Sequence, residues 1–222
     1  MAMSNLSRNH QERVVLIHGL AARPWMLGLL ASRLRAEGFA TESFFYRSIR
    51  ASIPKIAERF LQRLRQLDAD TETARIHIVC HSMGGIITRQ ALLNETPRKL
   101  GRVVMLAPPN HGSLTAAFWG PLVKPICPAA QQLSSRPGSY VQTLPEPTDG
   151  EWAILAAKYD RVVAVNSTRL QRPHRHQVIP TGHLRLLIRR DTAQLAARFL
   201  KTGQFLEDHT PQHDSQPANA AR

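Results

Sequence analysis

Short apolar segments alternate with amphipathic helical segments along most of the chain. The apolar segments predict buried strands at residues 13–17, 39–46, 75–80, 102–107, 152–157 and 177–179. Between them, apolar residues recur three or four positions apart, which predicts helices after Pro24, after Pro54, over 86–93 and over 191–200. This alternation predicts an α/β fold, in which about six mostly parallel strands have helices on both faces.

The length of 222 residues fits a single domain, which we expect over residues 1–206. Residues 108–150 interrupt the alternation and contain eight of the fifteen prolines. We therefore expect a proline-rich, lid-like insertion there, with a short helix around 114–119. Residues 207–222 contain no large apolar side chain, and we expect them to form a disordered tail.

Positive charge is the unusual bulk property, with a formal net charge of +13 at pH 7. Residues 161–190 contribute seven arginines and no acidic residue. Such a surface can attract an anionic substrate or associate weakly with an anionic membrane, or it can simply favour solubility. No nucleic-acid-binding motif accompanies the charge, so we expect no nucleic-acid partner.

The location of the protein is predicted from what the sequence lacks. The N-terminal residues contain no apolar run typical of a secretory signal, and no segment has the roughly 18 apolar residues of a membrane span. Cys80 and Cys127 are far apart and one lies in a predicted strand, so we expect two free thiols. These features favour a cytoplasmic protein.

The segment Ile78–Gly85, with the sequence IVCHSMGG, joins a predicted strand directly to a predicted helix. A sharp turn between a strand and a helix places its central residue, here Ser82, at an exposed apex. The usual pattern is G-x-S-x-G, in which small residues allow the close approach of two backbones. Here Cys80 replaces the first glycine and Gly84 retains the second. The pattern predicts a nucleophilic serine, with the Met83 N–H as an oxyanion-hole donor.

Three segments together resemble a known superfamily. VCHSMGG resembles the nucleophile turn of bacterial lipases and carboxylesterases of the α/β-hydrolase superfamily, and VVLIHGLAARPWM and LAPPNHGS resemble two of their other conserved segments. The resemblance follows segment order over about residues 13–200 and implies a minimal α/β-hydrolase. It also implies that the second oxyanion donor is the backbone N–H of Leu20, just after His18-Gly19.

A serine nucleophile needs a general base and an acid that orients the base. In this fold the acid follows the serine in the chain, and the histidine comes last. Among the acidic candidates, Asp160 follows a strand at the carboxyl edge of the sheet, whereas the others are predicted at the wrong end of the sheet or pointing away: Glu95, Glu146, Asp149 and Glu151. KYDRVV also resembles the acid segment of the family. We therefore predict Asp160 as the acid.

Three late histidines are candidates for the base. His174 and His176 precede the last predicted strand or lie at its start, whereas His183 follows that strand at the carboxyl edge. GHLRLL resembles the segment around the catalytic histidine of the family. We therefore predict a triad of Ser82, Asp160 and His183.

This arrangement predicts a serine-dependent carboxylester hydrolase that needs neither a metal nor an organic cofactor. The same apparatus serves acyltransferases and thioesterases, which are the first alternative, and a non-catalytic basic scaffold is the second. His111 is expected to be structural or to line the substrate cleft. Phe118 and Trp119 are expected to line an acyl pocket or a lid, or to form a small satellite core.

Overall fold

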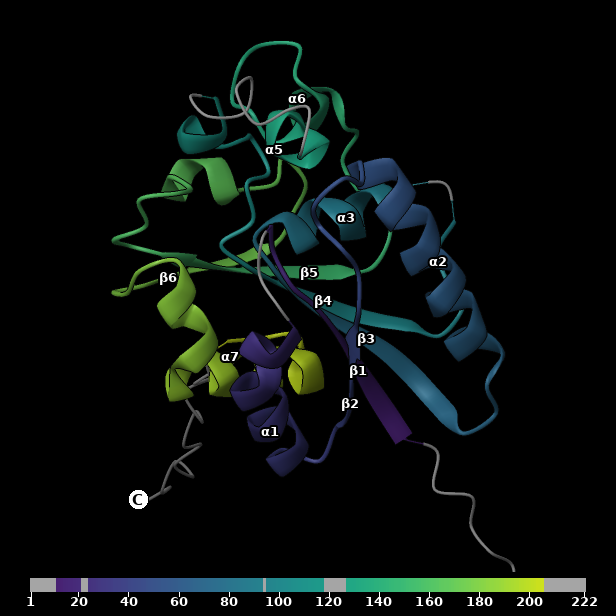
Figure 1. Ribbon diagram of the computed structural model, residues 1–222. Coiled ribbons are helices and arrows are strands. Elements are labelled where there is room, and N and C mark those ends of the chain that lie inside the picture. Colours follow the sequence, from purple (N-terminus) through teal and green to yellow (C-terminus); the bar gives the residue numbers. More distant parts are fainter. Residues whose placement is uncertain (1–10, 21–23, 94, 118–126, 206–222) are drawn as a thin grey trace, which may run out of the picture.

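The computed structural model describes residues 11–20, 24–93, 95–117 and 127–205 (Figure 1). Phe118 and Trp119 of the expected acyl pocket and the predicted tail, 207–222, lie outside these residues. All six predicted strands are confirmed: β1 (Gln11–Ile17), β2 (Ala40–Phe44), β3 (Thr73–His81), β4 (Leu100–Leu106), β5 (Glu151–Ala157) and β6 (Arg175–Ile179). They form one sheet in the order β2-β1-β3-β4-β5-β6, and every neighbouring pair is parallel.

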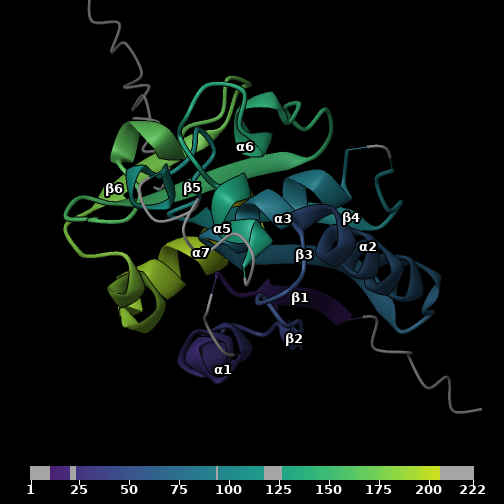
Figure 2. The same cartoon turned by 45° about the horizontal axis from the view of Figure 1, so that its top comes forward.

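Helices cover both faces of the sheet, as predicted (Figures 1 and 2). α1 (Gly28–Ala36) and α7 (Arg190–Thr202) lie on one face, and α2 (Ile53–Ala69) and α3 (Met83–Ala91) lie on the other. Successive strand residues point to opposite faces, so β1 places Val14 and Leu16 in the core under α1 and α7. Val15 and Ile17 point to the core under α2 and α3. Strands with two buried faces are therefore apolar at nearly every position.

α3 begins three residues earlier than its apolar periodicity predicts. The helix starts at Met83, directly after Ser82, rather than at Ile86. The difference arises because Gly84 and Gly85 carry no side chain that could contribute to an apolar pattern. The transition from strand to helix is consequently shorter than the sequence pattern indicates.

The described parts of the proline-rich insertion pack onto the molecule. Residues 114–117 are helical, and α5 (Pro128–Gln132) and α6 (Tyr140–Thr143) are short helices. Ala129, Leu133, Val141 and Leu144 are buried in the same core as α2 and α3. These parts of the insertion therefore belong to the core, and a lid function for it stays a prediction.

Two further expectations concern the cysteines and the membrane. Cys80 and Cys127 are free thiols, as predicted, and Cys80 is buried in β3. Within the described residues, no helix combines the length and the apolar character that crossing a membrane requires.

The parallel sheet determines where a functional site can form. All six strands point the same way, so the residues that follow β1, β3, β5 and β6 meet at one edge of the sheet. Gly19, Ser82, Asp160 and His183 follow these four strands in that order.

Candidate active site

Ser82 occupies a strained turn between β3 and α3. Its backbone angles are φ 54° and ψ −124°, in a region that residues other than glycine rarely adopt. Such a conformation costs on the order of 1–3 kcal/mol and persists only where surrounding contacts enforce it. Here the Ser82 N–H donates to the Leu106 carbonyl at 2.9 Å, and the Gly85 N–H donates to the Ser82 carbonyl at 2.9 Å. The turn is therefore fixed from both β4 and α3.

Close backbone contacts explain the small residues around this turn. A Cβ atom on Gly84 would lie 2.7 Å from the Ile17 carbonyl oxygen and 2.8 Å from that of His18. A Cβ atom on Gly19 would lie 2.9 Å from the Ser82 Cβ. The Cys80 side chain, by contrast, fits into the core and its Sγ donates to the Val104 carbonyl at 3.5 Å. Glycine is thus required at position 84, whereas position 80 accepts a small side chain.

Asp160 and His183 lie together at the carboxyl edge. The His183 Nδ1–H donates to Asp160 Oδ2 at 2.6 Å, and Asp160 Oδ1 accepts from the N–H groups of Val162 (2.8 Å) and Val163 (2.9 Å). The Asp160 side chain is fully buried, with 0% exposure. Burial alone would raise the pKa of this carboxyl, but the hydrogen bonds from His183, Val163 and Val162 outweigh it and hold the pKa below its usual range. Asp160 is therefore an ionised carboxylate that accepts a hydrogen bond from the imidazole.

A cavity of about 640 Å³ contains both Ser82 and His183. We call it the Ser82 cavity. Leu20, the predicted second oxyanion donor, also lines it. Met83 is buried at the first position of α3, where helix N–H groups have no partner within the helix. Apolar side chains from the insertion and from the segment after Asp160 form much of the remaining wall: Ala116, Ala130, Leu133, Val162 and Val163.

His81, directly before Ser82, contacts His183. The two ring centroids are 4.7 Å apart, and His81 Nε2–H donates to the His183 carbonyl at 3.2 Å. Burial, with the nearby His183 as a smaller cause, lowers the pKa of His81 to about 3. His81 is therefore neutral at ordinary pH and packs against the segment that carries His183.

His18 braces the loop after β1, close to Leu20. Its ring stacks on Tyr46 with centroids 4.1 Å apart, and its Nδ1–H donates to the Gly19 carbonyl at 2.8 Å. The Tyr46 hydroxyl donates to the His18 carbonyl. Burial lowers the pKa of His18, so the ring is neutral in this position.

The structure places His111 outside the Ser82 cavity. It lines a neighbouring depression of about 420 Å³. Its N–H donates to the Ser167 carbonyl at 2.9 Å, and its carbonyl accepts from Gln142 Nε2 at 2.5 Å. These bonds hold the His111 backbone in place, and whether the side chain is structural or contacts substrate stays a prediction. His174 and His176 lie at the start of β6, away from the carboxyl edge, as expected.

A buried polar network joins α3 to the segments around Asn110, Leu144 and Thr168, and sequence reasoning missed it. Arg89 in α3 is 1% exposed, and its guanidinium donates to the Asn110 carbonyl and Oδ1, both at 3.2 Å, and to the Leu144 carbonyl at 2.8 Å. Asn110 Nδ2 donates in turn to the Thr168 carbonyl at 2.7 Å. Nearby, Ser113 Oγ donates to the Val162 carbonyl at 2.6 Å. The sequence signal was an arginine in a predicted helix that is largely buried, and it did not identify the distant partners.

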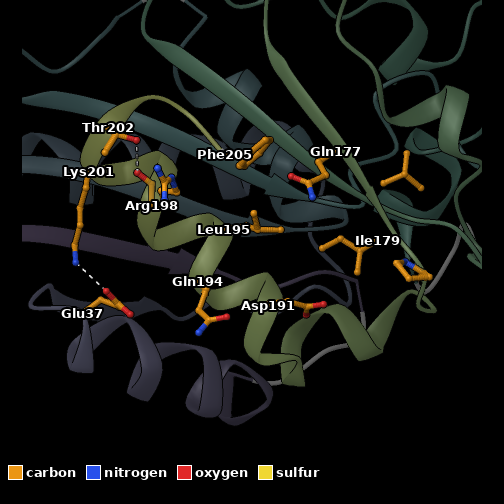
Figure 3. Close-up of a pocket in the computed structure, with 12 residues that line it drawn as sticks. Glu37, Gln177, Ile179, Asp191, Gln194, Leu195, Arg198, Lys201, Thr202 and Phe205 are labelled. Carbon is orange, nitrogen blue, oxygen red and sulfur yellow. Dashed lines mark hydrogen bonds and ion pairs between the residues drawn. The ribbon is translucent and has the colours of Figure 1, made fainter. Parts of the chain in front are cut away.

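A second cavity, of about 770 Å³, lies between β6 and α7 (Figure 3). We call it the α7 cavity. Its lining includes the ion pair between Lys201 Nζ and Glu37 Oε2 at 2.8 Å, and among the described residues it includes no serine, cysteine or histidine. Among the described residues, it therefore lacks the pairing of a serine with a histidine that the Ser82 cavity has.

The sequence model of the family described as "Alpha/beta hydrolase family" matches residues 14–222, so the chain belongs to this family. The molecule is thus a hydrolase of this fold. No curated protein sequence shows a significant match to it.

Solved structures of the same fold include several lipolytic enzymes. A lipase from Bacillus licheniformis, BlEst2 in mature form, is 16% identical with a TM-score of 0.65, over 80% of this chain and 87% of the lipase. The esterase Pf2001 from Pyrococcus furiosus is 15% identical with a TM-score of 0.65, over 87% of this chain and 84% of the esterase. The phospholipase PlaB from Legionella pneumophila is 19% identical with a TM-score of 0.65, over 87% of this chain but only 57% of the phospholipase. At these identities the likeness concerns the fold.

Proposed function

We propose that the protein is a carboxylester hydrolase in which Ser82, His183 and Asp160 form the catalytic triad. The observation that carries the proposal is the hydrogen bond of 2.6 Å between His183 Nδ1 and the buried Asp160 carboxylate. The same histidine lines an apolar cavity together with Ser82, whose backbone is strained. A proton on Nδ1 leaves the lone pair of a neutral imidazole on Nε2. That nitrogen is the atom that accepts the proton of the nucleophile.

Acylation begins when Ser82 Oγ attacks the ester carbonyl and its proton passes to His183 Nε2. The negative charge that develops on the carbonyl oxygen is stabilised by the N–H groups of Met83 and Leu20, each of which contributes about 3 kcal/mol. Asp160 stabilises the imidazolium. The ester C–O bond then breaks, and His183 returns the proton to the departing alcohol.

Deacylation repeats the sequence with water. His183 Nε2 removes a proton from the water as its oxygen attacks the acyl-enzyme. The tetrahedral intermediate collapses, the carboxylic acid leaves, and the proton returns to Ser82 Oγ. Water can reach the base because the His183 side chain is 11% exposed.

Two further observations support an ester as the substrate. The Ser82 cavity is lined mainly by apolar side chains, which suits an acyl chain. The lipase, esterase and phospholipase named above share the fold and, by their names, act on esters.

A fluorophosphonate probe and p-nitrophenyl esters of increasing acyl length test the proposal. The wild-type protein should be labelled and should hydrolyse the esters, and Ser82→Ala should lose both activities. Ser134→Ala provides a matched control, because Ser134 is another buried serine that does not line the Ser82 cavity. Labelling of Ser82→Ala at the wild-type level would contradict the proposal, as would absence of both activities from the wild-type protein, the result expected of a non-catalytic scaffold.

Product analysis separates hydrolysis from the alternative reactions of this fold. With an ester substrate and an added alcohol or amine, a hydrolase releases mainly free acid. An acyltransferase would release mainly the acylated acceptor. A thioester offered beside the oxygen ester of the same acyl chain identifies a thioesterase by its higher kcat/KM.

A further inference from the structure

Two arginines lie at the Ser82 cavity next to the proposed triad. Arg161 directly follows Asp160, and Arg185 comes two residues after His183. Both line the cavity and both are exposed. Within the described part of the chain, neither guanidinium has a hydrogen bond or an ion pair with another side chain.

Among the residues that the structure describes, the charged side chains that line this cavity are the two arginines. No aspartate or glutamate is among the lining residues of the Ser82 cavity. Asp160 is near in sequence, but its carboxylate is fully buried and already accepts hydrogen bonds from His183, Val162 and Val163. Among the described residues, its hydrogen bonds are therefore made with His183 and the following backbone rather than with the exposed Arg161 guanidinium.

A third cation, Lys158, contacts a residue that lines the cavity. Lys158 Nζ lies 5.7 Å from the centroid of the Tyr159 ring, and Tyr159 lines the same cavity. The α7 cavity differs, because its lining contains acidic as well as basic side chains, including the pair between Lys201 and Glu37. The positive charge is therefore a property of the cavity that holds Ser82.

We propose that Arg161 and Arg185 bind an anionic group of the substrate, so that the enzyme prefers esters that carry a phosphate or carboxylate on the alcohol side. The acyl chain would occupy the apolar wall formed by Leu133, Ala130 and Val163, and the anionic group would lie at the exposed guanidinium groups. This inference rests on the proposed ester hydrolase function. The anion could belong to a dissolved ester or to a lipid headgroup, and the experiment distinguishes these two sources.

The first measurement compares 1-butyrylglycerol with 1-butyrylglycerol 3-phosphate, which have the same acyl chain and both dissolve in water. The wild-type enzyme should have the higher kcat/KM for the phosphorylated ester. The double variant Arg161→Gln/Arg185→Gln should lose about tenfold in kcat/KM for that ester, mainly through KM, because each exposed contact between a cation and an anion contributes a few-fold. Its kcat/KM for the neutral ester should change by less than about twofold, and added salt should weaken the preference.

A matched control removes two positive charges elsewhere. Arg59 in α2 and Arg190 at the start of α7 are exposed and line neither cavity. Arg59→Gln/Arg190→Gln should retain the preference for the phosphorylated ester. An equal loss in the two double variants would overturn the proposal, because net charge alone would then explain the effect.

Vesicles identify the source of the anion. Hydrolysis of phosphatidylglycerol vesicles is compared with hydrolysis of phosphatidylcholine vesicles for the wild-type enzyme and both double variants. A preference for the anionic vesicles, without one for the dissolved phosphate ester, assigns the arginines to a lipid surface. If the enzyme already prefers the phosphorylated ester among the dissolved substrates, the arginines bind the anionic group of the substrate molecule itself. Absence of an Arg161- and Arg185-dependent preference in both comparisons would overturn the inference.

A binding measurement separates failure of this inference from failure of the proposed function. Calorimetry with butyl phosphate and with butanol uses Ser82→Ala, which cannot turn over an ester. Butyl phosphate should bind more tightly than butanol, and Arg161→Gln/Arg185→Gln in the same background should remove the difference. If the wild-type protein hydrolyses no ester, the proposed function fails, while equal binding of the two probes refutes the anion site.

Discussion

The Ser82 cavity and the α7 cavity are similar in volume, but a lining residue of each takes part in a different kind of carboxylate pair. In the Ser82 cavity, the lining residue His183 donates to Asp160 at 2.6 Å. In the α7 cavity, the lining residue Asp191 accepts from Arg189 Nε at 2.8 Å. Hydrogen bonding by Arg189 lowers the pKa of the Asp191 carboxyl, so both aspartates are ionised.

The partner of each carboxylate decides what chemistry is available. A guanidinium keeps its proton under all ordinary conditions, so the pair of Asp191 and Arg189 can only stabilise the structure. An imidazole can accept a second proton and release it, so the pair of Asp160 and His183 can act as a general base. Volume alone would favour the α7 cavity, at about 770 Å³ against about 640 Å³. Chemistry therefore identifies the site better than size does.

The largest expected effect comes from making the same substitution in both carboxylate pairs. Asp160→Asn should lower kcat for p-nitrophenyl butyrate by about 10³- to 10⁴-fold, because the amide favours the wrong imidazole tautomer. Asp191→Asn should leave kcat within about twofold, since it only weakens an exposed ion pair. Steady-state kinetics of the two variants provides the measurement. Comparable losses in both would remove the distinction between the cavities.

The buried Arg89 in the network with Asn110 and Leu144 should matter more for stability than an exposed arginine does. Arg89→Met should lower the free energy of unfolding by about 3 kcal/mol, because the carbonyls of Asn110 and Leu144 lose buried donors. Arg59→Met, at an exposed site in α2, should change it by no more than about 0.5 kcal/mol. Urea unfolding monitored by circular dichroism measures both. A small effect of Arg89→Met would show that the network relaxes easily.

Alanine substitutions at two glycines, one on each face of the sheet, test how closely the backbone is packed at each position. Gly84→Ala should destabilise the fold by about 1–3 kcal/mol and reduce turnover, because its methyl group meets the carbonyls of Ile17 and His18. Gly28→Ala, at the start of α1, has open space around its Cβ position. It should be neutral or stabilising by up to about 1 kcal/mol. Thermal unfolding of the two variants decides the matter, and equal effects would argue against the close contact at Ser82.

Ionisation of Asp160 should also make the free energy of unfolding depend on pH, and this effect should be smaller than those above. The folded protein holds the pKa of this carboxyl below its unfolded value, so its ionised form stabilises the fold at neutral pH. That contribution is fully present above the unfolded pKa of about 3.9 and is lost as the pH falls through the folded pKa. The difference in unfolding free energy between wild type and Asp160→Asn should therefore shrink on acidification. A difference that stays constant between neutral pH and the acid transition would contradict this.

The smallest effect is expected at the ion pair of the α7 cavity. Lys201→Ala removes the contact with Glu37, in which both side chains are more than 40% exposed (44% and 41%). The loss of stability should be below about 1 kcal/mol, and ester hydrolysis should be unchanged. A clear loss of turnover in this variant would assign the α7 cavity a role that its lining does not indicate.

The sequence predicted the features that depend on local pattern. The central strands were recognisable because both of their faces are buried. The turn at Ser82 was recognisable because its small neighbours are close in the chain. The positions of Asp160 and His183 followed from strand order, since parallel strands bring their carboxyl ends to one edge. The structure brings these two side chains together, and their catalytic roles await the experiments above.

Features that depend on distant contacts could not be predicted in the same way. The bonds from Arg89 to Asn110 and Leu144 join segments that are 21 and 55 residues apart. The position of His111 is determined by backbone bonds to Ser167 and Gln142, which no local pattern reveals. The start of α3 was misplaced because glycines carry no periodic signal. In each case the missing information lies in another part of the chain.

The backbone conformation of Ser82 has a consequence for how activity is acquired during folding. The turn depends on the Leu106 carbonyl in β4 and on close packing of Gly84 against the end of β1. Neither local helix formation nor a collapsed chain supplies these contacts, because three strands must first align side by side. Such non-local pairing is slow compared with helix formation. A refolding chain should thus regain helical signal well before it can turn over substrate, and recovery of catalysis marks the completed sheet.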